Sequence, residues 1–184
     1  QVIAACVQAG QPGKMGANDG KLSMPPVPPT VKVPVTLHIY DLGTNPGFRA
    51  LNHVLRPLGS ALVHCGVEVF GREWSFNGAE GIFFCGPTRC DGHTYSESHA
   101  MGGTSSTREE VMRILKLLQR KWSQEDYDVL FRNCCHFSNA LCLRLGVGAI
   151  PSWVTRLAQS GAYITTAGEN LFCCRQKQTN TFQF

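Results

Sequence analysis

Residues 131–137 read FRNCCHF and place two thiols and an imidazole directly ahead of an apolar stretch. The residues that follow carry apolar side chains at intervals of four, which is the spacing of one face of an α-helix. We therefore predict a helix over about residues 134–145, with Cys134 at its first position and glycines just beyond its end. From the residues alone, the two thiols could be inert core, a disulfide, metal ligands or the nucleophile of an enzyme.

Strands are predicted mainly before this helix. Alternating apolar and polar residues, rich in β-branched side chains, predict strands at residues 33–41, 61–69, 72–77 and 81–84. Glycine-containing turns join the last three, which indicates an antiparallel meander. Residues 85–106 are rich in Gly, Ser, Thr and Cys, and we expect them to form a loop.

Three further helices are predicted from apolar spacing, at residues 48–58, 107–122 and 150–159. The second begins with a capping box, in which Thr107 and Glu110 are expected to satisfy each other's backbone N–H groups. Strands grouped before helices predict the α+β class, a single domain with a small antiparallel β-sheet packed with helices.

The organisation of the chain is expected to be simple. Residues 1–31 form a Gly- and Pro-rich N-terminal arm, residues 32–160 the folded domain, and residues 161–184 a C-terminal tail. The chain has 184 residues, of which 43% are hydrophobic, enough for one medium-sized core.

Composition narrows the classes of function. The formal net charge of +4 is dispersed, and without a basic stripe we expect no nucleic-acid binding. We also expect no signal peptide, because residues 1–10 lack a basic region. Nine cysteines are an odd number, and without a targeting signal they are expected to stay reduced. The predicted location is therefore the cytoplasm, with the nucleus as the alternative.

Zinc binding is one alternative for the cysteines. Cys85 and Cys90 are separated by four residues, with His93 and His99 nearby, but no second pair with zinc-ligand spacing follows. A zinc site in this loop remains open, although we predict neither a metal nor a cofactor. Cys65, Cys85 and Cys142 are interpreted as small buried apolar residues.

Nucleophilic catalysis is the other alternative. A reactive cysteine needs a thiolate, which a helix N-terminus and a nearby imidazole both favour. Cys134 would lie at such a terminus, and the helix-start N–H groups could hold an oxyanion. His136 is too close in sequence to face Cys134, so His64, in the middle of a predicted strand, is the better candidate base.

Five segments resemble the PPPDE family of cysteine peptidases, which includes the desumoylating isopeptidases. Residues 35–42 (VTLHIYDL) resemble its first strand, and residues 62–69 (LVHCGVEV) with 71–76 (GREWSF) resemble its histidine motif. Residues 127–138 (YDVLFRNCCHFS) resemble its cysteine motif, and residues 150–154 (IPSWV) its closing helix.

The resemblance implies a permuted papain-like fold, with Cys134 as the nucleophile and His64 as the base. The implied activity is the removal of ubiquitin or SUMO from conjugated proteins. The alternatives are a non-catalytic module that binds ubiquitin-like tails and a thioesterase, such as a depalmitoylase, that uses the same dyad. Pairing as a homodimer is a further expectation from the family.

Two neighbours of Cys134 are interpreted separately. Asn133 is expected to cap the helix rather than to take part in catalysis. Cys135 stands where the family commonly has Asn, and it is either core filler or part of a redox lock with a neighbouring thiol. A bridge between Cys134 and Cys135 themselves would be strained.

The tail contains a second pair of adjacent cysteines. Cys173 and Cys174 lie between an apolar dipeptide and basic residues, a pattern typical of S-acylation that would tether the chain to a membrane. The alternative is a tail whose thiols have no such role.

Overall fold

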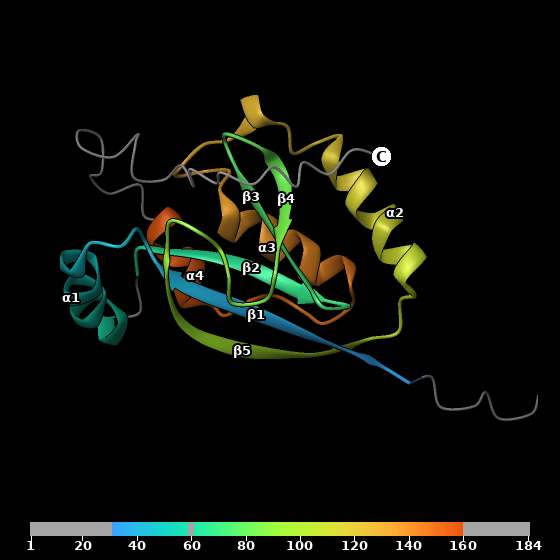
Figure 1. Ribbon diagram of the computed structural model, residues 1–184, viewed down its shortest axis with the longest axis horizontal. Helices are drawn as coiled ribbons and strands as arrows, with labels where there is room; N and C mark the ends of the chain where they lie inside the picture. Colours follow the sequence, from blue (N-terminus) through green and yellow to red (C-terminus); the bar gives the residue numbers. More distant parts are fainter. Residues whose placement is uncertain (1–30, 59–60, 160–184) are drawn as a thin grey trace, which may run out of the picture.

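The computed structural model describes residues 31–58 and 61–159, which fold around one antiparallel sheet (Figure 1). Its strand order is β4-β3-β2-β1-β5. The strands are β1 Val33–Asp41, β2 Val63–Val69, β3 Arg72–Asn77, β4 Gly81–Cys85 and β5 Thr94–Thr104. The α+β class and the β2-β3-β4 meander predicted from the sequence are thereby confirmed.

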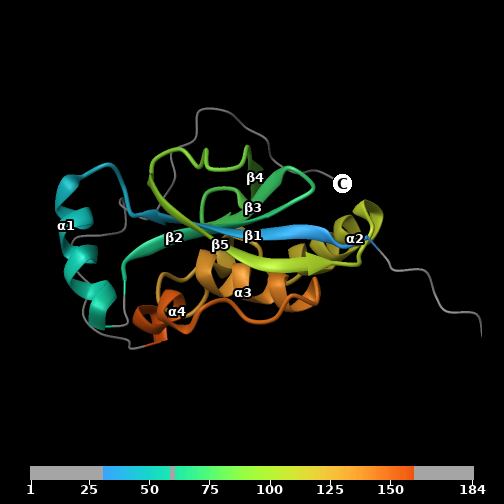
Figure 2. The same cartoon turned by 90° about the horizontal axis from the view of Figure 1, so that it is seen from below.

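The helices lie around this sheet. They are α1 Pro46–Leu55, α2 Arg108–Gln119, α3 Cys134–Arg144 and α4 Ser152–Gln159, with short 3₁₀ turns at Arg56–Leu58 and Gln124–Asp126. Figure 2 shows α3 and α4 on one face of the sheet, with α1 and α2 near its two ends. In the described ranges, no helix is long and apolar enough to cross a bilayer.

Alternation along β2 divides its side chains between two buried layers. Val63, Cys65, Val67 and Val69 belong to the main core, which also contains Phe137 of α3. On the other face, Tyr40 of β1 belongs to a smaller buried cluster with residues of β4 and of the loop that follows it. The buried states predicted for Cys65, Cys85 and Cys142 are confirmed.

The sheet opens beside the first half of β2. β2 pairs with β3 only at Val67–Val69, whereas its pairing with β1 continues back to Val63. In the opening, the Ser75 hydroxyl of β3 donates to the Cys65 carbonyl oxygen at 2.7 Å, so a side chain satisfies this carbonyl. The opening leaves room for a helix start to approach the middle of the sheet.

The predicted loop at residues 85–106 was wrong over its second half, which is strand β5. β5 is an edge strand whose side chains are mostly exposed, so it shows no apolar alternation. Its place is set by backbone pairing with β1, including a bulge opposite Val35 and Thr36. Gly102, with φ +98°, supplies backbone freedom at this irregularity.

The other predicted helices are present, and the capping box of Thr107 and Glu110 is confirmed at the start of α2. The apolar spacing within residues 48–58 also marks a helix, but it does not mark a buried face. Leu51, Val54 and Leu58 are exposed, because α1 lies beyond the end of the sheet rather than on its face. Polar contacts attach this helix instead.

Candidate active site

His64 is held in a buried, aromatic environment on β2. It lies opposite Tyr40 in the β1–β2 register, and only 3% of its surface is exposed. Its ring stacks on that of His93 with centroids 4.4 Å apart, and the Tyr40 ring is tilted against it at 6.0 Å. These contacts restrict the ring to one plane.

Cys134 is the first residue of α3, and Asn133 is its N-cap. The Asn133 Oδ1 atom accepts hydrogen bonds from the N–H groups of Cys135 and His136, at 3.0 and 3.2 Å. Its Nδ2 atom donates to the Val129 carbonyl oxygen at 2.7 Å, which anchors the preceding loop. The predicted capping role of Asn133 is therefore confirmed.

His136 contributes to the same cap. Its Nδ1 atom lies 2.8 Å from Asn133 Oδ1, and the Asn133 N–H donates to that ring nitrogen at 3.4 Å. Burial lowers the pKa of the His136 imidazole. The ring is thus directed at the helix cap.

The electrostatics of this helix start favour a thiolate at Cys134. Hydrogen bonds with Cys135 and Cys65, together with the charge and a hydrogen bond of His64, hold the pKa of the Cys134 thiol well below its usual range. Burial opposes this effect but is outweighed. The pKa values of Cys65 and Cys135 are raised, chiefly through their hydrogen bonds with Cys134, so these two thiols keep their protons. The two residues that sequence reasoning selected, His64 and Cys134, therefore lie close enough to interact.

Ser75 fixes how the His64 ring is protonated. The Ser75 Oγ atom lies 3.1 Å from His64 Nε2 and gives its single proton to the Cys65 carbonyl. Oγ can therefore only accept at Nε2, which places the ring proton on that nitrogen and the lone pair on Nδ1. The Cys90 Sγ atom also lies against Nε2, at 3.3 Å.

A buried carboxyl group lies on the same face of the sheet as the His64 ring. Glu73 is fully buried, and both of its oxygens accept hydrogen bonds from the Tyr40 hydroxyl, at 2.9 and 2.8 Å. The Thr88 N–H donates to it as well, at 2.9 Å. Burial raises the pKa of Glu73, although these hydrogen bonds oppose the effect. Burial also raises the pKa of Tyr40, so its hydroxyl stays a donor.

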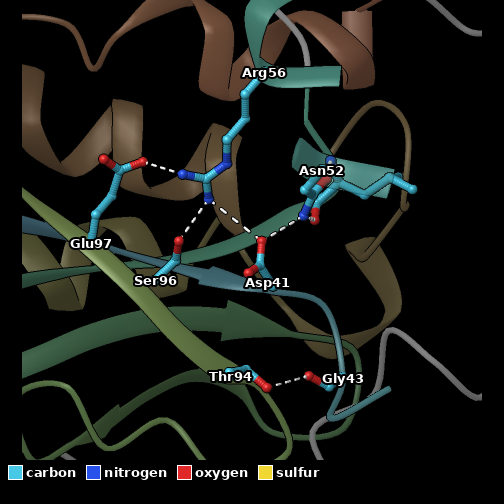
Figure 3. Close-up of polar contacts among 8 residues, drawn as sticks. Asp41, Gly43, Asn52, Arg56, Thr94, Ser96 and Glu97 are labelled. Carbon is cyan, nitrogen blue, oxygen red and sulfur yellow. Dashed lines mark hydrogen bonds and ion pairs between the residues drawn. The ribbon is translucent and has the colours of Figure 1, made fainter. Parts of the chain in front are cut away.

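A polar network secures the chain just before β2 (Figure 3). The Asn52 amide nitrogen donates to Asp41 at 2.7 Å and to the Leu62 carbonyl at 2.8 Å, and its oxygen accepts from the Leu62 N–H. Arg56 extends the network by donating to Asp41 and to residues of β5. Since Leu62 is two residues before His64, this network fixes where β2 begins.

The zinc interpretation of the loop is not supported. Cys85 and Cys90 are buried around Tyr40, His93 is stacked on His64, and His99 is exposed on β5. Across residues 31–58 and 61–159, the cluster with the spacing of metal ligands is Cys65, Cys134 and Cys135. Two of the loop residues, Cys90 and His93, belong to the surroundings of His64 instead.

Sequence reasoning missed Ser75, Cys90 and His93 as neighbours of His64. Ser75 lies in a strand that was predicted, but its proximity to His64 depends on how β3 diverges from β2. Cys90 and His93 come from a loop whose path has no periodic signal. Only their residue types, Cys and His, marked them as candidates for chemistry.

The fold and this site define an α+β domain in which a strand-borne imidazole meets a thiol at a helix start. The sequence profile described as "PPPDE putative peptidase domain" matches residues 33–172. The chain belongs to this peptidase family.

Curated relatives agree with this assignment. A DeSI-like protein of Arabidopsis thaliana is 31% identical over 134 residues, which cover 71% of this chain and 57% of the relative. The Desumoylating isopeptidase 1 homolog of Caenorhabditis elegans is 31% identical over 135 residues, 69% of this chain and 39% of the relative. The DeSI-like protein sdu1 of Schizosaccharomyces pombe is 29% identical over 152 residues, 79% of this chain and 74% of the relative. The chain thus spans about half the length of the first two.

Proposed function

We propose that this chain is a cysteine isopeptidase that removes SUMO, or a related ubiquitin-like modifier, from conjugated proteins. The observation that carries the proposal is the lowered pKa of Cys134 at the start of α3, next to His64. A thiolate formed there is a ready nucleophile for an acyl group.

The reaction follows from the two side chains. His64 takes the Cys134 thiol proton on Nδ1, and the resulting thiolate sulfur attacks the carbonyl carbon of the isopeptide bond. The imidazolium then gives this proton to the leaving lysine amine as the C–N bond breaks. Water, deprotonated by His64, hydrolyses the thioester and restores the thiol. Ser75 acts as a positioning residue, because its oxygen accepts a hydrogen bond from Nε2 and so keeps the lone pair of the His64 ring on Nδ1.

The oxyanion is assigned to the helix start. The Asn133 side chain already occupies the N–H groups of Cys135 and His136. The Cys134 N–H is therefore the helix-start amide that we assign to the developing oxyanion, with support from the helix dipole.

The choice of modifier rests on steric access and on the relatives' names. Cys134 is only 4% exposed, so the acyl group must approach through a narrow opening. A Gly-Gly tail suits such an opening because it carries no side chains. One relative is named a desumoylating isopeptidase, which favours SUMO over ubiquitin.

A SUMO probe with a C-terminal electrophile tests this function. The expected result is one covalent adduct on Cys134, located by mass spectrometry, which is absent in Cys134→Ser and slowed about 100-fold or more in His64→Ala. Cys142→Ser, on the same helix, and His99→Ala, on exposed β5, are matched controls that should react like the unmodified chain.

Other outcomes contradict the proposal at different points. An adduct on another cysteine refutes the assigned site, and labelling by a ubiquitin probe alone refutes the modifier. Turnover of a palmitoyl thioester without cleavage of a SUMO isopeptide would favour the thioesterase alternative. Tight binding of SUMO without any adduct would favour the non-catalytic module.

A further inference from the structure

Three buried thiols meet at the candidate active site. The Sγ atoms of Cys65, Cys134 and Cys135 all lie within 4.8 Å of one another, and those of Cys134 and Cys135 are 4.0 Å apart. None of the three residues is more than 4% exposed. In the proposed hydrolysis only the Cys134 sulfur forms a covalent bond, while the other two thiols act on it through hydrogen bonds.

We propose that Cys65 and Cys134 form a reversible disulfide when the chain meets hydrogen peroxide or another peroxide, with Cys65 as the resolving thiol. This inference rests on the proposed function in one respect, since the reactivity of Cys134 toward peroxide comes from the same thiolate. The bond would block the nucleophile and is therefore a redox lock on the enzyme.

Cys65 is the geometrically suitable partner. A disulfide between Cys134 and Cys135 would close a strained ring between adjacent residues. Cys90 lies against the His64 ring, with its Sγ atom 3.3 Å from Nε2, and it is not a member of the cluster formed by Cys65, Cys134 and Cys135. Cys65 lies on the strand that α3 covers and is distant from Cys134 in the sequence. A bond between their sulfurs therefore does not close a small strained ring. A disulfide needs about 2.05 Å between sulfurs, and a single change of χ1 rotamer moves a sulfur by about 3 Å.

The chemistry balances with one peroxide molecule. The Cys134 thiolate attacks a peroxide oxygen, forming an S–O bond and breaking the O–O bond, and the hydroxide released takes up a proton as water. The Cys65 sulfur then attacks the Cys134 sulfenic acid, forming the S–S bond and breaking the S–O bond. The Cys65 proton leaves with the hydroxyl group as a second water. The two thiols are oxidised, the peroxide is reduced, and a dithiol reverses the bond.

The lock would also protect the nucleophile. A sulfenic acid that meets no thiol is oxidised further to sulfinic acid, which thiols do not reverse. Because Cys65 keeps its proton beside Cys134 and is fully buried, it reacts only within the molecule.

Peptide mapping tests the inference. The reduced chain is treated with hydrogen peroxide, quenched in acid, alkylated and digested without reduction. The expected result is a linked pair of peptides joined through Cys65 and Cys134, which dithiothreitol separates. Cys134 sulfinic acid without this linked pair, or a bond from Cys134 to Cys135 or Cys90, would overturn it.

Two variants sharpen the test. In Cys65→Ser, the linked pair should be absent and Cys134 should accumulate as sulfinic acid that dithiothreitol does not reverse. Cys142→Ser removes another buried thiol of α3 outside the sulfur cluster and should form the linked pair as before. If Cys65→Ser does not fold, the peptide map of the unmodified chain by itself shows whether the Cys65–Cys134 bond forms. The map needs no substrate, so its failure is distinct from a failure of the reduced chain to label with the SUMO probe.

Discussion

At the scale of single residues, the character of Cys134 is decided by its immediate partners. Burial by itself would disfavour a thiolate, as it does at Cys142, whose pKa burial raises to about 12. Cys134 is equally enclosed, yet hydrogen bonds with Cys135 and Cys65, with His64 nearby, outweigh that cost. Two cysteines on one helix therefore differ in chemistry because only one has partners for its charge.

The pH dependence of alkylation tests this difference. The thiolate is present above the thiol's pKa, so a lowered pKa moves the onset of reaction to lower pH. We expect iodoacetamide to modify Cys134 in the folded chain at lower pH than in the urea-unfolded chain, where a thiol has a pKa of about 8.5. Cys135→Ala should move the onset back upward, because Cys135 is the largest contributor. Coincident folded and unfolded profiles would contradict the assigned thiolate.

Ser75 allows a second prediction at this scale. Ser75→Ala removes the acceptor at His64 Nε2. One neutral hydrogen bond is worth about 0.5–1.5 kcal/mol, so the maximal rate of SUMO-probe labelling should fall about 2- to 10-fold. The probe concentration that gives half this rate should not change, because Ser75 is not expected to touch the modifier.

Ser138→Ala is the matched control for Ser75. Ser138 is also fully buried, and its hydroxyl also lies near the Cys65 carbonyl, at 3.4 Å. An equal loss of rate in both variants would mean that the effect is structural rather than a matter of orienting His64.

At the scale of elements, α1 shows how a helix can be attached by polar groups. Leu51 and Val54 face solvent, whereas Asn52 is 1% exposed and joins Asp41 of β1 to the chain just before β2. The backbone N–H and C=O groups of Leu62 have this side chain as their partner. Loss of the amide would leave buried polar groups unsatisfied.

Asn52→Ala is therefore expected to lower the free energy of unfolding by about 1–3 kcal/mol. Urea denaturation followed by tryptophan fluorescence measures the change. Leu51→Ala, at the preceding and exposed position, should change it by less than about 0.5 kcal/mol. A larger loss in Leu51→Ala than in Asn52→Ala would show that α1 is held by apolar packing after all.

At the scale of the whole molecule, separate segments converge on one buried carboxyl group. Glu73 of β3 receives Tyr40 of β1 and the Thr88 N–H from the loop after β4. It also lies against Gly66 of β2, where an added Cβ would stand 2.5 Å from Glu73 Oε1 and 2.7 Å from its Cγ. The absence of a side chain at Gly66 is what admits Glu73 to this position.

Gly66→Ala should consequently destabilise the fold by about 1–3 kcal/mol through overpacking, measured as a lower urea midpoint. Gly86→Ala is the matched control, because its added Cβ would meet Arg89 only at 3.6 Å, an ordinary contact, on an exposed turn. The steric argument fails if the two variants lose the same stability.

Local patterns in the sequence were sufficient for most of the elements and for the two principal residues of the site. The capping box of α2, the helix that begins at Cys134 and the β2-β3-β4 meander each follow from interactions between near neighbours. The selection of His64 and Cys134 followed from their motifs, and their roles in catalysis remain a proposal. The predicted arm and tail, including Cys173 and Cys174, lie largely outside the described residues.

Tertiary structure decided what depends on contacts between distant segments. β5 exists because β1 offers it backbone partners, and nothing in its own side chains signals a strand. Ser75 meets His64 because β3 diverges from β2, and Cys65 meets Cys134 because α3 begins over that opening. Hydrogen bonding within one turn leaves a mark on the local sequence, whereas proximity across a sheet depends on register and packing, which no short segment encodes.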